Sequence, residues 1–321
     1  MLIVAWETTA ECNLSCRYCR ASASASPDPD ELDTSEALAF IESIAPLQPM
    51  FILSGGEPLL RPDIFQIARR AVSLGLRVSM ASNGTLLTAE AANKIAASGI
   101  SRVSISLDGA SAELHDQSRG QGSFLRALEG MKNLRGKIGF QINFTITRKN
   151  ERDIPEFFAL AKDLGAEAVH FFFLVPTGRG LVEDMISPER QEELLMQIDR
   201  ERENWPLEVQ VTCAPQYARI SSPGKGRRSG GCLAGKRFVF ISRKGDVYPC
   251  GYFPVRAGSI RENNFMDIWT NSRLLQDLRE KPLSGKCGRC SFSKTCGGCR
   301  ARAYAETGDY LGPDPSCSLA V

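Results

Sequence analysis

The stretch Cys12-Asn-Leu-Ser-Cys16-Arg-Tyr-Cys19 places three cysteines in the spacing CxxxCxxC, directly after a short apolar segment. Three closely spaced thiolates on one loop can ligate three irons of a cubane cluster and leave the fourth iron open for an exogenous ligand. The structural alternatives are buried free thiols or a zinc knuckle that lacks one ligand. The spacing alone is moderately specific, so the elements around the loop decide its meaning.

Short apolar runs alternate with segments of helical periodicity on both sides of this loop. The expected strands are Leu2–Thr8, Met50–Leu53, Leu76–Ala81, Arg102–Leu107, Gly139–Thr145 and Ala168–Leu174. The expected helices lie near Ser35–Ala45, Asp63–Leu74, Ala89–Ser98, Phe124–Leu134 and Asp153–Leu164. Strands that alternate with helices predict parallel βαβ units. We therefore expect an α/β fold, a partial (β/α)6 TIM-like barrel with a cysteine-rich iron–sulfur domain after it.

Functional residues of a parallel barrel lie on the loops that follow the carboxyl ends of its strands. The distinctive polar residues fall at those places. The three-cysteine loop follows the first expected strand, Gly55–Glu57 the second, Asn83 the third, Asp108 the fourth and Arg179 the sixth. This agreement strengthens the interpretation of the loop as a cluster site.

The chain of 321 residues contains 11 cysteines and 2 histidines, and its net charge is +2. An odd cysteine count and an N-terminus without a basic stretch or cleavage site argue against a secreted disulfide framework. Thiolate-rich sites favour iron–sulfur clusters or zinc. The small net charge and the lack of a long apolar run predict a cytoplasmic protein that binds neither nucleic acid nor membrane.

The composition changes after an expected helix near Pro188–Glu203. We expect a core domain over residues 1–205 and an auxiliary domain over 206–321, because the second part holds 8 of the 11 cysteines in turn-rich sequence with short expected strands at Phe238–Ser242 and Val247–Pro249.

The segments Cys12–Cys19, Ser54-Gly-Gly-Glu-Pro58 and Ser106-Leu-Asp-Gly109 together resemble the radical S-adenosylmethionine superfamily. The resemblance implies an enzyme whose cofactors are S-adenosylmethionine and a [4Fe-4S] cluster on Cys12, Cys16 and Cys19. In this family one electron from the cluster cleaves S-adenosylmethionine to a 5′-deoxyadenosyl radical, which abstracts a hydrogen atom.

The same resemblance assigns a site for S-adenosylmethionine. Its members are Tyr18 beside the adenine, Asn83 and Ser106 at the ribose, and Gly55, Gly56, Glu57, Asp108 and Arg119 at the methionine end. The glycines allow close backbone approach, Glu57 accepts from the methionine ammonium, and Arg119 is the candidate for its carboxylate. Ordinary turns at the glycines and at Asp108, and a structural ion pair at Arg119, are the alternatives.

The C-terminal cysteines resemble the seven-cysteine SPASM domain, which binds auxiliary clusters in many enzymes of the superfamily. One departure is that two residues, not three, separate Cys296 from Cys299. With Cys213 added, the resemblance implies one or two auxiliary iron–sulfur clusters. One would be ligated by Cys213, Cys232, Cys250 and Cys299, and the other by Cys287, Cys290, Cys296 and Cys317. A buried free thiol at Cys213 and structural zinc at the CxxC pairs are the alternatives.

Four longer segments look like the tetrapyrrole branch of the superfamily, which includes the alternative-pathway heme synthase and heme d1 biosynthesis enzymes. They are Val4–Thr9, Val175–Gly180, Thr212–Pro215 and Cys296–Leu311. The implied reaction is oxidative decarboxylation of iron-coproporphyrin III propionates to vinyl groups, which gives protoheme. The implied partners are a tetrapyrrole and a flavodoxin- or ferredoxin-type electron donor. The alternatives are a heme d1-pathway enzyme that removes propionates, a peptide-modifying SPASM maturase and a non-catalytic electron carrier.

A substrate with several propionates needs cationic anchors. The candidates are Arg179, Lys225, Arg227, Arg228, Lys236 and Arg237. A solvated basic loop is the alternative for the last five. Phe171–Phe173 resembles a stacking surface, but strand alternation predicts that it belongs mainly to the core. Members of the tetrapyrrole branch often carry a histidine after Cys-Ala-Pro, and this chain has Gln216 there.

Overall fold

The computed structural model describes residues 1–221 and 231–319. Within them, one sheet has the strand order β10-β9-β8-β1-β2-β3-β4-β5-β6-β7. The strands are β1 Ile3–Glu7, β2 Met50–Ser54, β3 Arg77–Ser82, β4 Arg102–Ser106, β5 Phe140–Ile146, β6 Ala168–Phe173, β7 Glu208–Thr212, β8 Phe238–Ile241, β9 Asp246–Tyr248 and β10 Gly258–Ser259. The run from β8 through β1 to β7 is parallel, whereas β8, β9 and β10 pair antiparallel. This confirms the α/β class.

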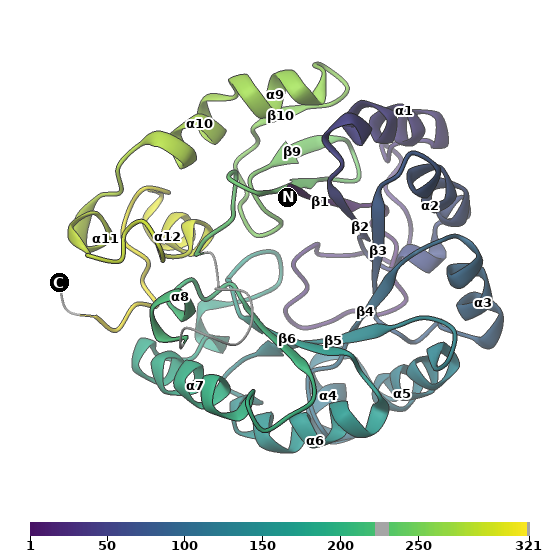
Figure 1. The fold of residues 1–321 in the computed structure, drawn as a ribbon, viewed down its shortest axis with the longest axis horizontal. Coiled ribbons are helices and arrows are strands. Elements are labelled where there is room, and N and C mark those ends of the chain that lie inside the picture. The colour runs from purple at the N-terminus through teal and green to yellow at the C-terminus, as the bar shows by residue number, and fades with distance from the viewer. Residues whose placement is uncertain (222–230, 320–321) are drawn as a thin grey trace.

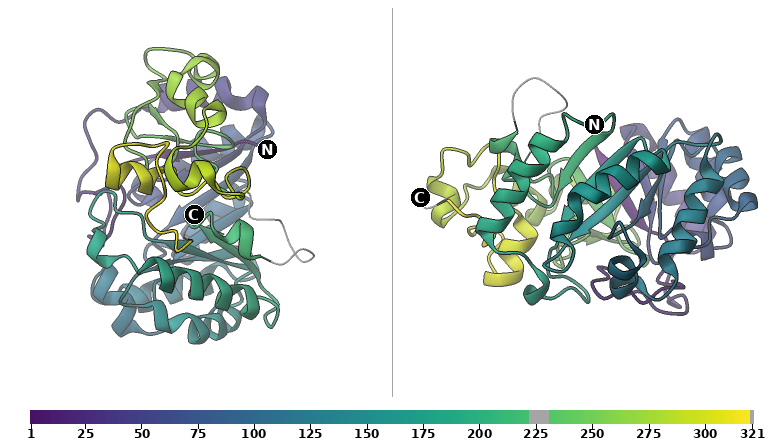
Figure 2. Two further views of the ribbon diagram at one scale, coloured as in Figure 1. Left: turned by 90° about the vertical axis from the view of Figure 1, so that its left-hand side faces the viewer. Right: turned by 90° about the horizontal axis from the view of Figure 1, so that it is seen from below.

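The helices form a ring outside the sheet (Figure 1). They are α1 Thr34–Ile44, α2 Ile64–Ser73, α3 Ala89–Ala97, α4 Ala112–Arg119, α5 Ser123–Leu134, α6 Ile154–Leu164, α7 Pro188–Glu201, α8 Tyr217–Ile220, α9 Phe265–Asn271, α10 Arg273–Glu280, α11 Gly285–Arg289 and α12 Arg300–Thr307. Figure 2 shows the yellow C-terminal residues at one end of the molecule and the blue early helices at the other. None of these helices has both the length and the apolar character that a bilayer crossing requires.

All six expected strands and the expected helices that alternate with them are present. The sequence prediction missed β7, because its stretch Glu-Val-Gln-Val-Thr holds only two strongly apolar residues and stays partly exposed. It also missed α4, whose residues are almost all polar; the Ser111 hydroxyl, which caps this helix, accepts from the Leu114 amide. The sheet continues across residue 205, since β7 pairs with β6 and β8 pairs with β1.

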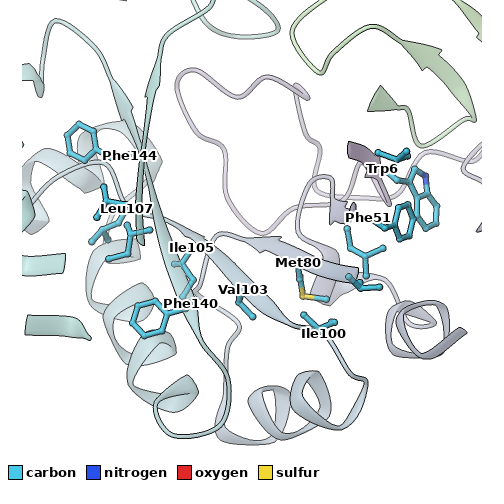
Figure 3. Close-up of a cluster of buried hydrophobic side chains, with 14 of the residues drawn as sticks. Trp6, Phe51, Met80, Ile100, Val103, Ile105, Leu107, Phe140 and Phe144 are labelled. Atoms are coloured by element: carbon cyan, nitrogen blue, oxygen red, sulfur yellow. The ribbon is translucent and has the colours of Figure 1, made fainter. Parts of the chain in front are cut away.

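The hydrophobic core lies between the outer face of the strands and the helices. Val103, Ile105, Phe140 and Phe144 point to this side of the sheet (Figure 3). Further along the sheet, Phe171 and Phe173 are buried in the same core, whereas Phe172 is only partly buried. The expectation that this Phe-rich strand serves mainly the core is therefore confirmed.

The inner face of the strands is polar and more exposed. Strand alternation turns Ser106, Asn143 and His170 away from the helices, and each is only partly buried. A polar inner wall differs from the packed apolar centre of a complete eight-stranded barrel.

Part of the basic segment predicted to anchor carboxylates lies outside the described residues, and the rest lies at the ends of the strands opposite the three-cysteine loop. Lys225, Arg227 and Arg228 lie in the part of the chain that the structure does not describe. Lys236 and Arg237 are exposed just before β8, where the Arg237 carbonyl accepts from the Ile3 amide. Because β8 is parallel to β1, these two cations lie at the amino ends of the strands, opposite the three-cysteine loop. The hypothesis that they anchor a substrate at that loop is wrong.

Candidate active site

The loop after β1 carries Cys12, Cys16 and Cys19 across the middle of the ring (Figure 1). The Cys12 sulfur accepts from the Leu14 amide at 3.4 Å, and the Cys19 sulfur from the Ala23 amide at 3.5 Å. Burial raises the pKa of Cys12 to about 11, and burial and the neighbouring Cys19 raise that of Cys16. Three thiols on one loop, two of whose sulfurs accept from backbone amides, can hold three irons of a cluster.

Gly55 and Gly56 form the contact between the β2–α2 turn and the three-cysteine loop. The Gly56 amide donates to the Thr9 carbonyl at 2.7 Å, and a Cβ at position 56 would lie 2.1 Å from the Glu11 carbonyl oxygen. Gly55 has φ of 144°, and a Cβ there would meet the Thr9 carbonyl at 2.8 Å. In this structure the backbone that approaches both glycines is therefore that of the loop itself.

Glu57 is fully buried and links this turn to the end of β3. Its carboxylate accepts from the Ser82 hydroxyl at 2.9 Å and from the Asn83 amide at 2.7 Å. Burial raises the pKa of Glu57 to about 7, although these donors act in the opposite direction. The Asn83 side chain in turn donates toward the Cys12 sulfur at 3.8 Å. Glu57 and Asn83 thus join β2 and β3 to the cysteine loop.

Asp108, Tyr18 and Arg119 form a buried cluster on the other side of the loop. The Tyr18 hydroxyl donates to Asp108 at 2.7 Å, Arg119 forms an ion pair with the same oxygen, and the Thr145 amide donates to the other oxygen at 2.6 Å. Burial lowers the pKa of Arg119, but the charges of Asp108 and Cys16 outweigh it and keep the pKa above its ordinary value. The cluster fixes a positive charge beside Cys16.

Ser106 ends β4 and lies on the inner face of the sheet, where Asn143 of β5 is its register partner. The sequence prediction missed two supporting residues, Thr145 and Asn150. The Asn150 side chain donates to the Asp108 carbonyl at 3.0 Å. Thr145 ends the expected fifth strand and donates through its backbone amide, and Asn150 follows that strand in a loop, so neither position carries a distinctive motif.

Arg179 holds the cysteine loop from the side of β6. Its Nε donates to the Cys16 carbonyl at 2.9 Å and one terminal nitrogen to the Ala23 carbonyl at 3.0 Å, while its backbone amide donates to the Cys19 carbonyl at 3.0 Å. Arg179 is therefore not a free carboxylate anchor: its Nε and one terminal nitrogen are committed to backbone carbonyls, which a loop of this irregular shape leaves without partners in a sheet or helix. Its other terminal nitrogen is buried and has no partner among the described residues, so contact of that nitrogen with a substrate carboxylate stays a prediction.

The eight C-terminal cysteines lie in two groups of four, hereafter the first and second thiol groups. Cys213, Cys232, Cys250 and Cys299 form the first. Burial, together with the nearby thiols of its group, raises the pKa of Cys213. Cys213 follows β7 and has φ of 61°, an unfavourable conformation for a residue with a side chain, so its surroundings hold it in place.

Cys287, Cys290, Cys296 and Cys317, the second thiol group, line one cavity. Three of its sulfurs accept from backbone amides at 3.4 Å: Cys287 from Asp314, Cys290 from Phe292 and Cys296 from Gly298. The Arg300 guanidinium approaches the Cys287 sulfur at 3.9 Å.

Asp314 stands between the two thiol groups. It pairs with Arg302 through two contacts of 3.1 and 3.2 Å, and both side chains are at most 1% exposed. Its carboxylate also accepts from the Cys299 amide at 2.6 Å and from the Gln216 side chain at 2.9 Å. Gln216 lines the cavity of the second thiol group. Its position after Cys-Ala-Pro therefore belongs to the auxiliary region and not to the inner wall of the barrel.

The chain matches the family model of the radical SAM superfamily over residues 6–161 and that of the SPASM iron–sulfur cluster-binding domain over residues 232–291. It is 47% identical to the AdoMet-dependent heme synthase of Methanosarcina barkeri, over 98% of this chain and 95% of the relative. The chain therefore belongs to the radical SAM superfamily, and it is a radical SAM enzyme that uses S-adenosylmethionine, a [4Fe-4S] cluster and auxiliary iron–sulfur clusters.

Further relatives carry three different names. The AdoMet-dependent heme synthase of Nitratidesulfovibrio vulgaris is 41% identical over 98% of this chain and 92% of its own length. The mycofactocin maturase MftC of Mycobacterium tuberculosis is 33% identical over 98% and 82%, and the pre-heme d1 synthase of Dinoroseobacter shibae is 32% identical over 99% and 86%. The fold is similar to that of Streptococcus suis SuiB bound to S-adenosylmethionine, with a TM-score of 0.81 at 17% identity over 99% of this chain and 77% of that one.

Replacing Arg179 by alanine is expected to loosen the cysteine loop and to reduce both its iron content and the cleavage of S-adenosylmethionine. Each lost hydrogen bond from the charged guanidinium contributes about 1.5–3 kcal/mol. Iron per chain and 5′-deoxyadenosine formation without substrate measure the effect. Arg179→Lys is the matched control, which keeps the charge but cannot bridge both carbonyls. Unchanged cleavage in Arg179→Ala would instead revive the carboxylate-anchor hypothesis.

Proposed function

We propose that the enzyme acts in heme biosynthesis and oxidatively decarboxylates propionates of iron-coproporphyrin III to vinyl groups, which gives protoheme. The observation that carries the proposal is the identity of 41–47% to two heme synthases over 98% of the chain, against 32–33% to the maturase and the pre-heme d1 synthase.

Cys12, Cys16 and Cys19 would ligate the catalytic cluster. When bound, S-adenosylmethionine and its cluster would supply the radical for removal of a hydrogen atom from the propionate carbon next to the ring, and an auxiliary cluster would supply the acceptor for the electron left when carbon dioxide departs. The chain surrounds that site with residues in fixed positions. Tyr18, Gly55, Gly56, Glu57, Asn83, Ser106, Asp108 and Arg119 are the proposed binding residues for S-adenosylmethionine. Their network holds the loop rigid and keeps one guanidinium beside Cys16.

The two thiol groups would each hold one auxiliary cluster, with four cysteine ligands apiece. The match to the SPASM iron–sulfur cluster-binding domain covers Cys232, Cys250, Cys287 and Cys290, members of both groups, and it favours clusters over structural zinc. We also propose that residues 1–205 and 206–321 are the two functional domains and that a flavodoxin- or ferredoxin-type protein in the cytoplasm donates the electron.

Anaerobic incubation with iron-coproporphyrin III, S-adenosylmethionine and a reductant tests the function. We expect each converted propionate to lose one carbon dioxide and two hydrogens, one hydrogen appearing in 5′-deoxyadenosine, and mass spectrometry of the porphyrin measures this. The same incubation with a propionate-bearing precursor of heme d1, and with a precursor peptide, tests the heme d1-type and maturase alternatives. Turnover of either, with iron-coproporphyrin III unchanged, would contradict the proposal.

A further inference from the structure

A row of polar side chains crosses the inner wall from the S-adenosylmethionine side to β7. Ser106 of β4 is the register partner of Asn143, Asn143 of His170, and His170 of Gln210. Register partners share one face of a sheet, so all four side chains lie on the inner wall. Neighbouring strands are about 4.8 Å apart, which places β6 roughly 10 Å along the wall from β4.

His170 is the member of this row with metal-binding chemistry. The Gln141 side-chain amide lies 3.1 Å from Nδ1 of His170 and 3.0 Å from the Asn143 side chain. The charged groups that act on the ring are Glu208 and Arg102, which form an ion pair at 3.4 Å near the amino ends of the strands. Burial lowers the pKa of His170 to about 4, so the imidazole is neutral at physiological pH.

The other histidine of the chain has a different environment. His115 is fully buried, and its Nδ1 accepts from the Asp108 amide at 3.1 Å. It packs against Phe124 with ring centroids 5.7 Å apart. His115 therefore supports the Asp108 turn from behind, whereas His170 is partly exposed on the inner wall.

We propose that Nε2 of His170 binds the iron of the porphyrin substrate and so sets the position of the macrocycle beneath the radical site. The proposal rests on the function proposed above. A neutral imidazole is a common ligand of heme iron, and its second nitrogen is usually held by a polar neighbour. Gln141 is that neighbour. With the amide oxygen of Gln141 turned toward the ring, it accepts from Nδ1–H, and the lone pair of Nε2 is free for iron. The Asn143 amide turns in the same way, so that its NH2 group donates to the same Gln141 oxygen.

The position fits the reaction. A macrocycle held through its central iron presents its propionates at the rim, and the row places the predicted ribose-side residue Ser106 two strands away from His170. Arg102 pairs with Glu167 at 2.9 Å as well as with Glu208, and it lies on the amino-terminal side of the row of Ser106, Asn143 and His170. The substrate would therefore rest between this charged layer and the cysteine loop.

Titration of the wild-type holoenzyme and of His170→Ala with ferric coproporphyrin III and with metal-free coproporphyrin III tests the proposal. We expect His170→Ala to lose the nitrogen-ligand signature in Soret absorption and electron paramagnetic resonance, and to bind the iron porphyrin at least tenfold more weakly. Affinity for the metal-free porphyrin should stay unchanged, which also shows that the variant is folded. Gln210→Ala, from the same row, should keep the nitrogen-ligand signature, and added imidazole should restore it in His170→Ala.

The possible failures are distinguishable. If His170→Ala binds ferric coproporphyrin III with the wild-type spectrum and affinity, the iron-ligand role is wrong and the proposed function stands. If the wild-type enzyme binds neither porphyrin, the proposed function itself fails and the role of His170 fails with it. If the variant loses affinity for both porphyrins equally, His170 shapes the cavity and does not ligate iron.

Discussion

Replacement of Cys12, Cys16 and Cys19 by alanine should abolish 5′-deoxyadenosine formation while the iron bound by the C-terminal cysteines is retained. The three thiols lie on the loop after β1, and the other eight lie after β7 in two separate groups. The two sets share no cysteine, so loss of one leaves the ligands of the other complete. Because a cluster must deliver the electron that cleaves S-adenosylmethionine, the expected loss of cleavage is total and not partial.

Metal analysis and product quantification on the anaerobically reconstituted triple variant measure both halves of this prediction. Cys287→Ala/Cys290→Ala is the reciprocal control, since it removes two thiols of the second group, lowers the iron content and leaves cleavage without substrate in place. Retained cleavage in the triple variant would show that another site is catalytic. Stoichiometric zinc with negligible iron would show that the C-terminal groups are structural zinc sites.

The sequence was sufficient for the elements whose physical signal is local. β1, β2 and β6 carry runs of apolar residues, and β3, β4 and β5 alternate apolar with polar residues between segments of helical periodicity. The spacing of Cys12, Cys16 and Cys19 is likewise visible without a structure. β7 was missed because two valines among polar residues make a weak pattern, and its place is fixed by pairing with β6. Tertiary pairing of this kind cannot be obtained from periodicity.

The partners of the charged residues could not be predicted from the sequence either. Arg179, Lys236 and Arg237 all appeared in sequence as cations near a polyanionic substrate. One of them binds loop carbonyls and the other two lie at the opposite ends of the strands. A guanidinium can bind a substrate carboxylate or a backbone carbonyl equally well, and only the fold decides which partner is within reach. His170, for which we propose a role above, has no sequence motif either, since it is one histidine within an apolar strand.

The second prediction with a large expected effect concerns Asp314. Asp314→Ala is expected to destabilise the C-terminal region by about 3–5 kcal/mol, because it leaves the Arg302 guanidinium buried without its partner. The same carboxylate accepts from the Cys299 amide of the first thiol group and from the side chain of Gln216, which lines the cavity of the second. Each thiol group thus loses part of its support. We expect auxiliary iron to fall by half or more, while the three-cysteine loop keeps its iron and its cleavage activity.

The test compares urea unfolding and iron content among Asp314→Ala, Asp314→Asn and the double variant Arg302→Met/Asp314→Leu. The comparison separates the effect of the lost charge from the effect of the changed side-chain shape. Asn keeps one acceptor oxygen, replaces the other by an NH2 donor and lacks the charge, so its effect should be intermediate. The double variant replaces the buried pair by apolar groups of similar size and should recover much of the stability, since no unpaired charge remains. It lacks the acceptor for the Cys299 amide, so the iron content of the first thiol group should recover less than the stability does. Equal losses in Asp314→Ala and in the double variant would show that the hydrogen bond to Cys299, and not the ion pair, holds this region together.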